Sequence, residues 1–149
     1  MSSYQELEDH FRGIADLNHA RAILGWDEAA MMPPGGGEAR ASALAAIDVL
    51  VHQRQTDPRL TDLLSAADEE SGLDDWQRAN LRELRREVEL ATCLPEAFVA
   101  AQSKACARSE QAWRYLRADN DWQGMRPLLE EVVRLAREEA GIQIGRAHV

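Results

Sequence analysis

The segment Ile23–Arg40, ILGWDEAAMMPPGGGEAR, joins the end of one amphipathic helix to the start of another. Two prolines followed by three glycines cannot continue an α-helix, so the segment specifies a shaped connection. We expect Trp26 to anchor the first helix in the core. We also expect Asp27 and Arg40 to tie the two ends of the turn together by a charge-assisted hydrogen bond.

On both sides of this turn, the spacing of apolar residues predicts helices. Ser3 and Glu6 form a candidate capping box for a first helix that runs to about Leu24. No run of alternating β-branched residues indicates a strand. Further helices are expected at about residues 38–53, 57–67, 74–92, 95–118 and 127–140. We therefore predict an all-α fold, an antiparallel helical bundle of about five to six helices.

The domain is expected to span residues 1–140 as a single helical unit. The last nine residues, GIQIGRAHV at 141–149, break the helical pattern and carry neither a cap nor a partner segment. We interpret 141–149 as a tail outside the domain, either disordered or artefactual.

Composition narrows the classes of partner. The net charge is -9, with 26 acidic against 17 basic residues, which argues against binding to nucleic acid or to an anionic membrane surface. No apolar run approaches the ~20 residues that a membrane-spanning helix needs. No secretory signal pattern precedes the first helix, so the expected location is cytoplasmic.

Candidate chemical sites are few, and each has a structural interpretation that we favour. No H-E-x-x-H motif occurs. Asp16 and His19 form a single i, i+3 pair that could bind a metal, but we interpret it as a solvated pair on the surface. The glycines at 35–37 could cradle an anion, but no Lys-Ser/Thr follows them, so a structural turn is favoured. Cys93 and Cys106 lack metal-ligand or redox spacing. We predict no catalytic residue, no metal ligand and no cofactor in this chain.

Four tryptophans, at positions 26, 76, 113 and 122, allow two interpretations. They could form an aromatic binding platform. Their positions at helix starts and on apolar faces favour a second role, as anchors of the core.

Several motifs in order resemble the N-terminal signature of the carboxypeptidase Taq family. The first comprises Trp26, Asp27, Met32, Pro33, Gly36 and Arg40, and the last comprises Trp113, Arg117, Asn120 and Asp121. Between them, the segment WQRANLRE at 76–83 is similar to the family's next long helix, and the pair Leu94-Pro95 resembles a characteristic helix start of the family. The resemblance covers about residues 4–140. Ala30 and Ala43 depart from it, because the family usually has Thr and Gln there.

This resemblance implies a zinc metallocarboxypeptidase that removes C-terminal residues from peptides, with helices walling a deep cleft above the zinc. In the family, the H-E-x-x-H helix, the third zinc ligand and the residues that bind the substrate carboxylate lie downstream of the matched region. We therefore expect an N-terminal fragment that lacks the zinc site, is inactive alone, and meets peptide substrate only as part of a full-length enzyme.

Two further expectations concern partners. Helices that would pack on a missing half should expose an apolar face, so we expect a homo-oligomer. The alternative function is a standalone helical protein–protein interaction module without enzymatic activity. The reading frame beyond codon 140 distinguishes the two, because a fragment would continue toward an H-E-x-x-H motif.

Overall fold

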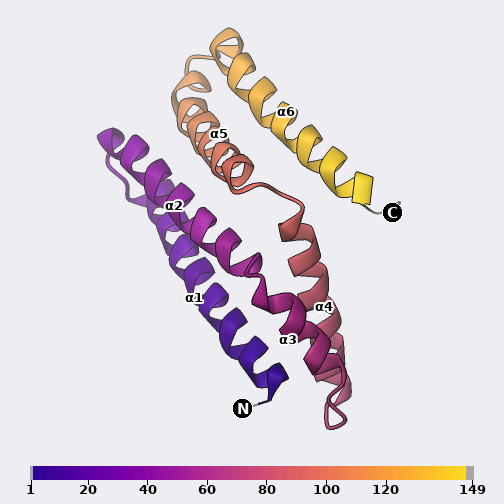
Figure 1. The fold of residues 1–149 in the computed structure, drawn as a ribbon. Helices are drawn as coiled ribbons and strands as arrows, with labels where there is room; N and C mark the ends of the chain where they lie inside the picture. Colours follow the sequence, from indigo (N-terminus) through magenta and orange to yellow (C-terminus); the bar gives the residue numbers. More distant parts are fainter. Residues whose placement is uncertain (1, 147–149) are drawn as a thin grey trace.

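The computed structural model describes residues 2–146, which fold into six α-helices and one short 3-10 helix (Figure 1). The predicted all-α class is confirmed, with no strand among these residues. The elements in chain order are α1 (Ser3–Ala30), η1 (Pro34–Gly36), α2 (Gly37–Gln55), α3 (Arg59–Asp68), α4 (Asp75–Thr92), α5 (Glu96–Leu116) and α6 (Trp122–Arg146).

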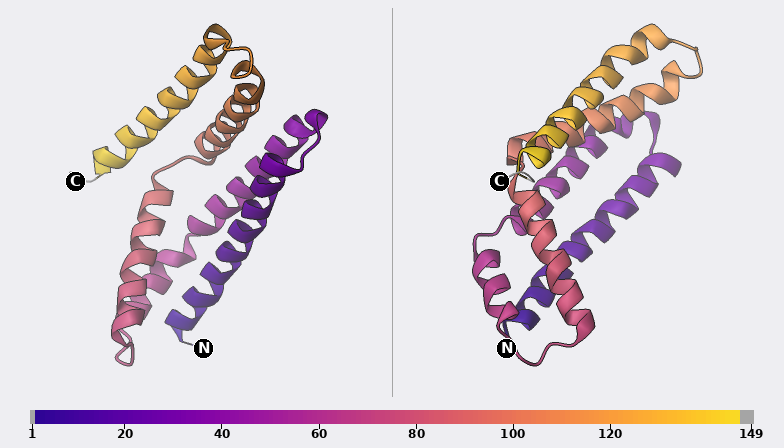
Figure 2. Two further views of the ribbon diagram at one scale, coloured as in Figure 1. Left: turned by 180° about the vertical axis from the view of Figure 1, so that it is seen from behind. Right: turned by 90° about the vertical axis from the view of Figure 1, so that its right-hand side faces the viewer.

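The helices form two antiparallel hairpins, α1–α2 and α5–α6, joined by the shorter α3 and α4. α2 packs against both α1 and α5, so the hairpins lie side by side. α3 packs on α1 and on α4. Figure 2 shows that the tips of both hairpins lie at one end of the molecule, while the N-terminus and the α3–α4 turn lie at the other.

The end near the N-terminus has a well-packed core. Leu7, Leu60 and Leu64 are fully buried there, and the Tyr4 hydroxyl accepts a hydrogen bond from the Asn80 amide at 3.0 Å. We call this cluster the N-terminal core, and its buried members are Tyr4, Leu7, Leu60, Leu64, Ala67, Leu81, Leu84 and Val88. It joins the first turns of α1 to α3 and α4, so three helices close around one apolar interior.

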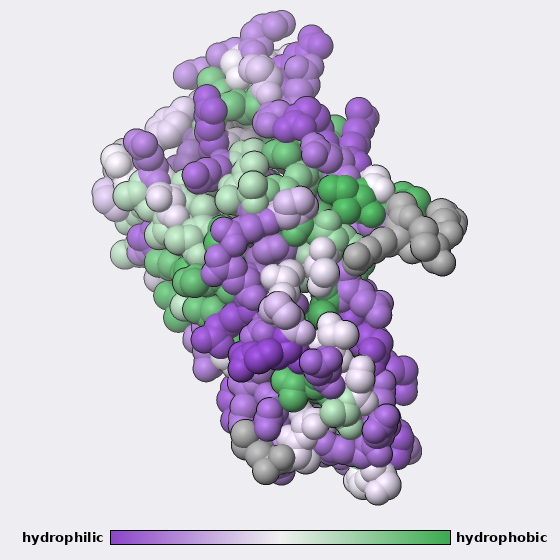
Figure 3. All heavy atoms as spheres, viewed as in Figure 1, coloured by the Kyte–Doolittle hydropathy of each residue, from purple (hydrophilic) through white to green (hydrophobic). Residues whose placement is uncertain are grey.

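The rest of the molecule, which we call the hairpin half (residues 18–55 and 96–146), buries fewer large apolar side chains. Only Leu135 of α6 is buried among the described residues of that helix. Trp26 is 62% exposed and Trp122 is 57% exposed. In Figure 3, hydrophobic atoms gather over the upper part of the molecule, which holds the hairpins, whereas the lower part is largely hydrophilic.

Local capping explains where helices begin. Asp74 and Gln77 form a capping box at the start of α4. The Asp74 carboxylate accepts from the Gln77 backbone N–H at 2.8 Å, and the Gln77 side-chain oxygen accepts from the Asp74 backbone N–H at 2.9 Å. The box predicted at Ser3 and Glu6 is wrong by one residue. Ser2 is the extended N-cap and pairs with Gln5, so Ser3 is already helical.

The predicted role of tryptophans as core anchors is wrong. α1 continues to Ala30, beyond the expected end near Leu24, and this helical continuation directs Trp26 away from the packed face. The other three tryptophans are also exposed, Trp76 on α4, Trp113 on α5 and Trp122 on α6. Apolar periodicity identified the helices but not which of their apolar faces has a partner.

Both predicted ends of the last helix are also wrong. It begins at Trp122 instead of Pro127, because the Asp121 carboxylate accepts from the Gly124 amide at 2.9 Å and caps an earlier start. Pro127 then lies inside α6 and lacks the N–H that would bond one turn back. The helix also passes Gly141 and continues to Arg146, where a break was expected after residue 140. Residues 147–149 of the expected tail lie outside the described residues.

Across residues 2–146, no helix is long and apolar enough to cross a membrane.

Candidate functional site

The turn between α1 and α2 is built around the carbonyl of Asp27. The amides of Met31 and Met32 both donate to that oxygen, at 2.9 and 2.8 Å, which ends α1 without a glycine C-cap. Pro33 follows in extended conformation and opens η1, so the chain reverses within a few residues. We call residues 27–40 the elbow.

An ion pair closes the elbow, as the sequence predicts. A guanidinium nitrogen of Arg40 pairs with the Asp27 carboxylate, and another donates to the Leu24 carbonyl at 3.4 Å. Both charged side chains are half-buried. Arg40 therefore holds the end of α1 against the start of α2 through one charged and one neutral acceptor.

Glycine is required at one position of the elbow. A Cβ atom built on Gly36 would lie 2.8 Å from Cγ of Met32, inside van der Waals contact. The half-buried Met32 side chain thus occupies the space that any larger residue would need.

A second cluster of the signature residues forms the turn between α5 and α6. Asn120 has a positive φ of 50°, a conformation that Asn tolerates better than most residues. Asp121 caps α6 as described above. The Arg117 guanidinium lies 4.9 Å from the ring centroid of Trp113, a cation–π contact at the surface.

Side chains of α5 tie the two hairpins together next to the elbow. The Gln111 amide donates to a carboxylate oxygen of Glu28 at 2.5 Å, and Arg114 donates to the Glu28 carbonyl at 2.7 Å. Arg114 also pairs with Glu110 at 3.0 Å. The sequence does not reveal the roles of Gln111 and Arg114, because their contacts with Glu28 span more than 80 positions and leave no local spacing signal.

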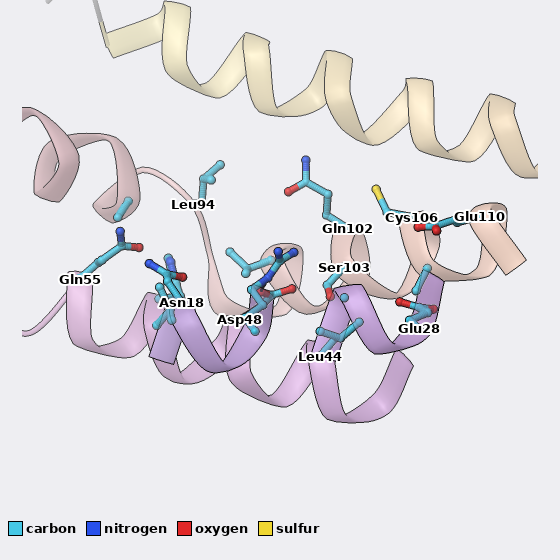
Figure 4. A pocket seen from close by; sticks show the side chains of 17 residues that line it. Asn18, Glu28, Leu44, Asp48, Gln55, Leu94, Gln102, Ser103, Cys106 and Glu110 are labelled. Atoms are coloured by element: carbon cyan, nitrogen blue, oxygen red, sulfur yellow. Dashed lines mark hydrogen bonds and ion pairs between the residues drawn. The ribbon is translucent and has the colours of Figure 1, made fainter. Parts of the chain in front are cut away.

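Below this tie, a groove of about 540 Å³ opens between α1, α2 and α5 (Figure 4). Arg21 of α1 pairs with Asp48 of α2 in its wall. Two buried polar residues, Glu28 and His52, also line it. Figure 4 places Glu28 beside Leu44 at one end, with Gln55 at the other.

Asp16, His19 and Cys106 are the candidate metal-ligand and nucleophile residues of the sequence. Within residues 2–146, no three His, Cys, Asp or Glu side chains are grouped so that they could hold a metal ion. Asp16 and His19 are both exposed, and no ion pair joins them. Partial burial raises the pKa of the Cys106 thiol, which favours the protonated, unreactive form.

The family model, a curated relative and solved structures that are similar to this chain all belong to carboxypeptidases. The model of the family described as carboxypeptidase Taq (M32) metallopeptidase matches residues 6–148. Thermostable carboxypeptidase 1 of Thermus thermophilus is 33% identical over 144 residues, which cover 95% of this chain and 28% of that protein. The chain thus spans about 28% of that relative's length.

Two solved structures are similar in fold and in sequence. Metallocarboxypeptidase 1 of Trypanosoma cruzi superposes with a TM-score of 0.72 at 37% identity, covering 94% of this chain and 28% of the other. The M32 carboxypeptidase of Deinococcus radiodurans superposes with a TM-score of 0.74 at 33% identity, and the match covers 96% of this chain and 29% of the other.

Proposed function

Because the chain belongs to the carboxypeptidase Taq (M32) metallopeptidase family, we propose that its helices form part of a zinc metallocarboxypeptidase that removes C-terminal residues from peptides. The observation that carries this proposal is the family match over residues 6–148. The paired elbow residues Asp27 and Arg40 support it, since two members of the family signature contact each other directly.

Within this proposal, the chain contributes structure and not chemistry. Its described histidines, cysteines and carboxylates do not fit a zinc site, because no three of them are grouped. The Nε2 atom of His10 is already engaged with the Arg54 carbonyl at 2.8 Å. We therefore assign no catalytic step to these residues, and we propose that the helices wall the substrate cleft of the enzyme.

A chimera tests the structural role. Residues 6–146 of this chain would replace the matching segment of the Thermus thermophilus carboxypeptidase. We expect the chimera to fold and to release C-terminal residues from an N-acylated peptide in a chelator-sensitive reaction. A folded chimera without activity contradicts the proposal, and the parent enzyme is the control.

An assay of the isolated 149-residue chain tests the second part. With added zinc, we expect no release of C-terminal residues above the buffer control. Robust release that a chelator abolishes would show that these residues do form a complete site.

We also propose that the chain alone self-associates through the apolar strip of α6. Trp122, Leu129 and Val133 are exposed there and line a shallow groove of about 490 Å³. Contiguous exposed apolar side chains favour contact with another surface, and the charged residues that border this groove, Arg126, Glu130, Arg134 and Arg137, resemble a polar rim. Sedimentation velocity should show mass increasing with concentration, and a monomer across the whole range would contradict it.

The same strip supports the second candidate function, a helical protein–protein interaction module without enzymatic activity. The chimera separates the two candidates. A module evolved for another partner would not restore the carboxypeptidase, whereas a wall of the cleft would.

A further inference from the structure

We propose that the groove between α1, α2 and α5 binds the side chain of a basic residue in a peptide, with its cationic head against Glu28. The cation is a guanidinium or ammonium group on an alkyl stem. This inference goes beyond the proposed function and does not depend on it, because it rests on one buried carboxylate and the space beside it.

Glu28 is a buried acid without a cation. The residue is 5% exposed, and one carboxylate oxygen accepts from the neutral Gln111 amide. The other oxygen has no hydrogen bond or ion pair with any residue in 2–146 and is not sealed from the groove. A buried carboxylate is costly unless a positive charge or further donors reach it, so the site favours a cationic ligand.

The other carboxylates of the groove are already neutralised. Asp48 pairs with Arg21, and Glu110 pairs with Arg114. The remaining contact of Arg114 is with the carbonyl of Glu28, not with its carboxylate. One uncompensated negative charge therefore remains in the groove, and it is located on Glu28.

The space beside Glu28 suits an alkyl stem. Gly25 lines the groove one turn before Glu28, and a Cβ atom built there would meet nothing within 4 Å. Apolar side chains along the walls can pack against methylene groups, as they do for buried lysine and arginine stems. These wall residues are Leu44, which Figure 4 places near Glu28, Val51 and Val99 along the groove, and Leu94 toward the end marked by Gln55.

A second polar group lies further along the groove. His52 is 7% exposed and lines the same space, yet its ring makes no hydrogen bond to the described residues. It lies two helical turns beyond Leu44 on α2, toward the end marked by Gln55 in Figure 4. A peptide amide beyond the basic side chain would find a hydrogen-bonding partner there, which favours a peptide over an isolated cation.

The test is a titration of the complete isotope-labelled chain with N-acetylarginine amide, followed by NMR. N-acetylcitrulline amide is the matched neutral probe, because it has the same shape without the charge. We expect saturable shifts of groove residues with the arginine probe, and binding weaker by about tenfold or more with the citrulline probe. Equal binding of the two probes, or no saturation in the millimolar range, overturns the proposal.

Two variants and one control refine the test. Glu28→Gln removes the charge and keeps an acceptor for Gln111, so arginine binding should weaken by about tenfold. Gly25→Leu fills the groove while improving helix propensity, so binding should be lost in a folded protein. Glu83→Gln removes an equal charge on α4, where Glu83 pairs with Arg86, and should leave binding unchanged. Unaltered binding in both groove variants contradicts the assignment even if citrulline binds weakly.

Discussion

The N-terminal core and the hairpin half are made from the same kind of amphipathic helix, yet they bury their apolar residues differently. In the N-terminal core, α1, α3 and α4 surround Leu7, Leu60 and Leu64. In the hairpin half, polar ties such as those on Glu28 join the helices, and tryptophans face outward. The difference shows that one region buries its large apolar side chains in an interior of its own, whereas the other leaves several of them exposed.

The largest expected contrast comes from truncating one apolar side chain in each region, a buried one in the N-terminal core and an exposed one in the hairpin half. Leu60→Ala should lower the free energy of unfolding by about 2–5 kcal/mol, because it leaves a cavity among fully buried neighbours. Val133→Ala, on the exposed strip of α6, should cost less than about 0.5 kcal/mol. Urea denaturation of both variants measures the contrast, and equal losses would show that the hairpin half is packed as tightly as the core.

The elbow tests how far the hairpin half depends on polar ties. Asp27→Ala leaves the half-buried Arg40 without its carboxylate and should cost about 1–2 kcal/mol, with a clearly lower melting temperature. Asp9→Ala is the control, because Asp9 pairs with Arg12 in an exposed i, i+3 arrangement worth little. An unchanged melting curve for Asp27→Ala would refute a stabilising role for the pair.

Removing a helix cap in the N-terminal region should lower the free energy of unfolding by less than removing the elbow ion pair. Asp74→Ala removes the carboxylate that accepts from the Gln77 backbone N–H in the α4 capping box, and should cost about 1 kcal/mol. Asp74→Asn keeps a capping oxygen and should retain most of the stability. Thermal denaturation distinguishes the two variants, and an equal loss in both would assign the effect to charge instead of capping.

The connection between the two regions carries a pH-dependent contact. Side-chain and backbone hydrogen bonds from Arg59 lower the pKa of Asp57 from 3.8 to about 2. A carboxyl whose pKa is depressed in the folded state stabilises it above the unfolded value, and this contribution is lost as pH falls from about 4 to about 2. The stability difference between the native chain and Asp57→Asn should therefore shrink over that interval. A difference that stays constant in an acid titration would rule out this linkage.

The smallest effect on folding is expected at the strip on α6. Trp122→Gln should change the free energy of unfolding by less than about 0.5 kcal/mol, because Trp122 is mostly exposed. It should nevertheless reduce self-association in sedimentation velocity. Trp76→Gln on α4 is a matched control that removes another exposed tryptophan. If both variants weaken association equally, the strip is not the contact surface.

The sequence predicts features that depend on neighbouring residues and fails where distant partners decide. Asp74 and Gln77 could be recognised because a capping box is complete within four residues. The Asp27–Arg40 pair could be expected because both residues lie in one short turn. Trp26 was misplaced because periodicity does not reveal which apolar face is covered. Glu28 was overlooked because its donors come from α5, far along the chain.

The unbroken length of α1 has a consequence for motion. Its 28 residues extend about 42 Å, from the N-terminal core to the elbow. The backbone amides of this one helix therefore sample both regions. We expect their hydrogen-exchange protection to fall steadily from the turn that holds Leu7 toward Trp26. Amides near Leu7 should exchange only when the whole protein unfolds, whereas those near Trp26 should exchange through local opening of the helix. A single helix would then record, residue by residue, where the cooperative unit of the protein ends.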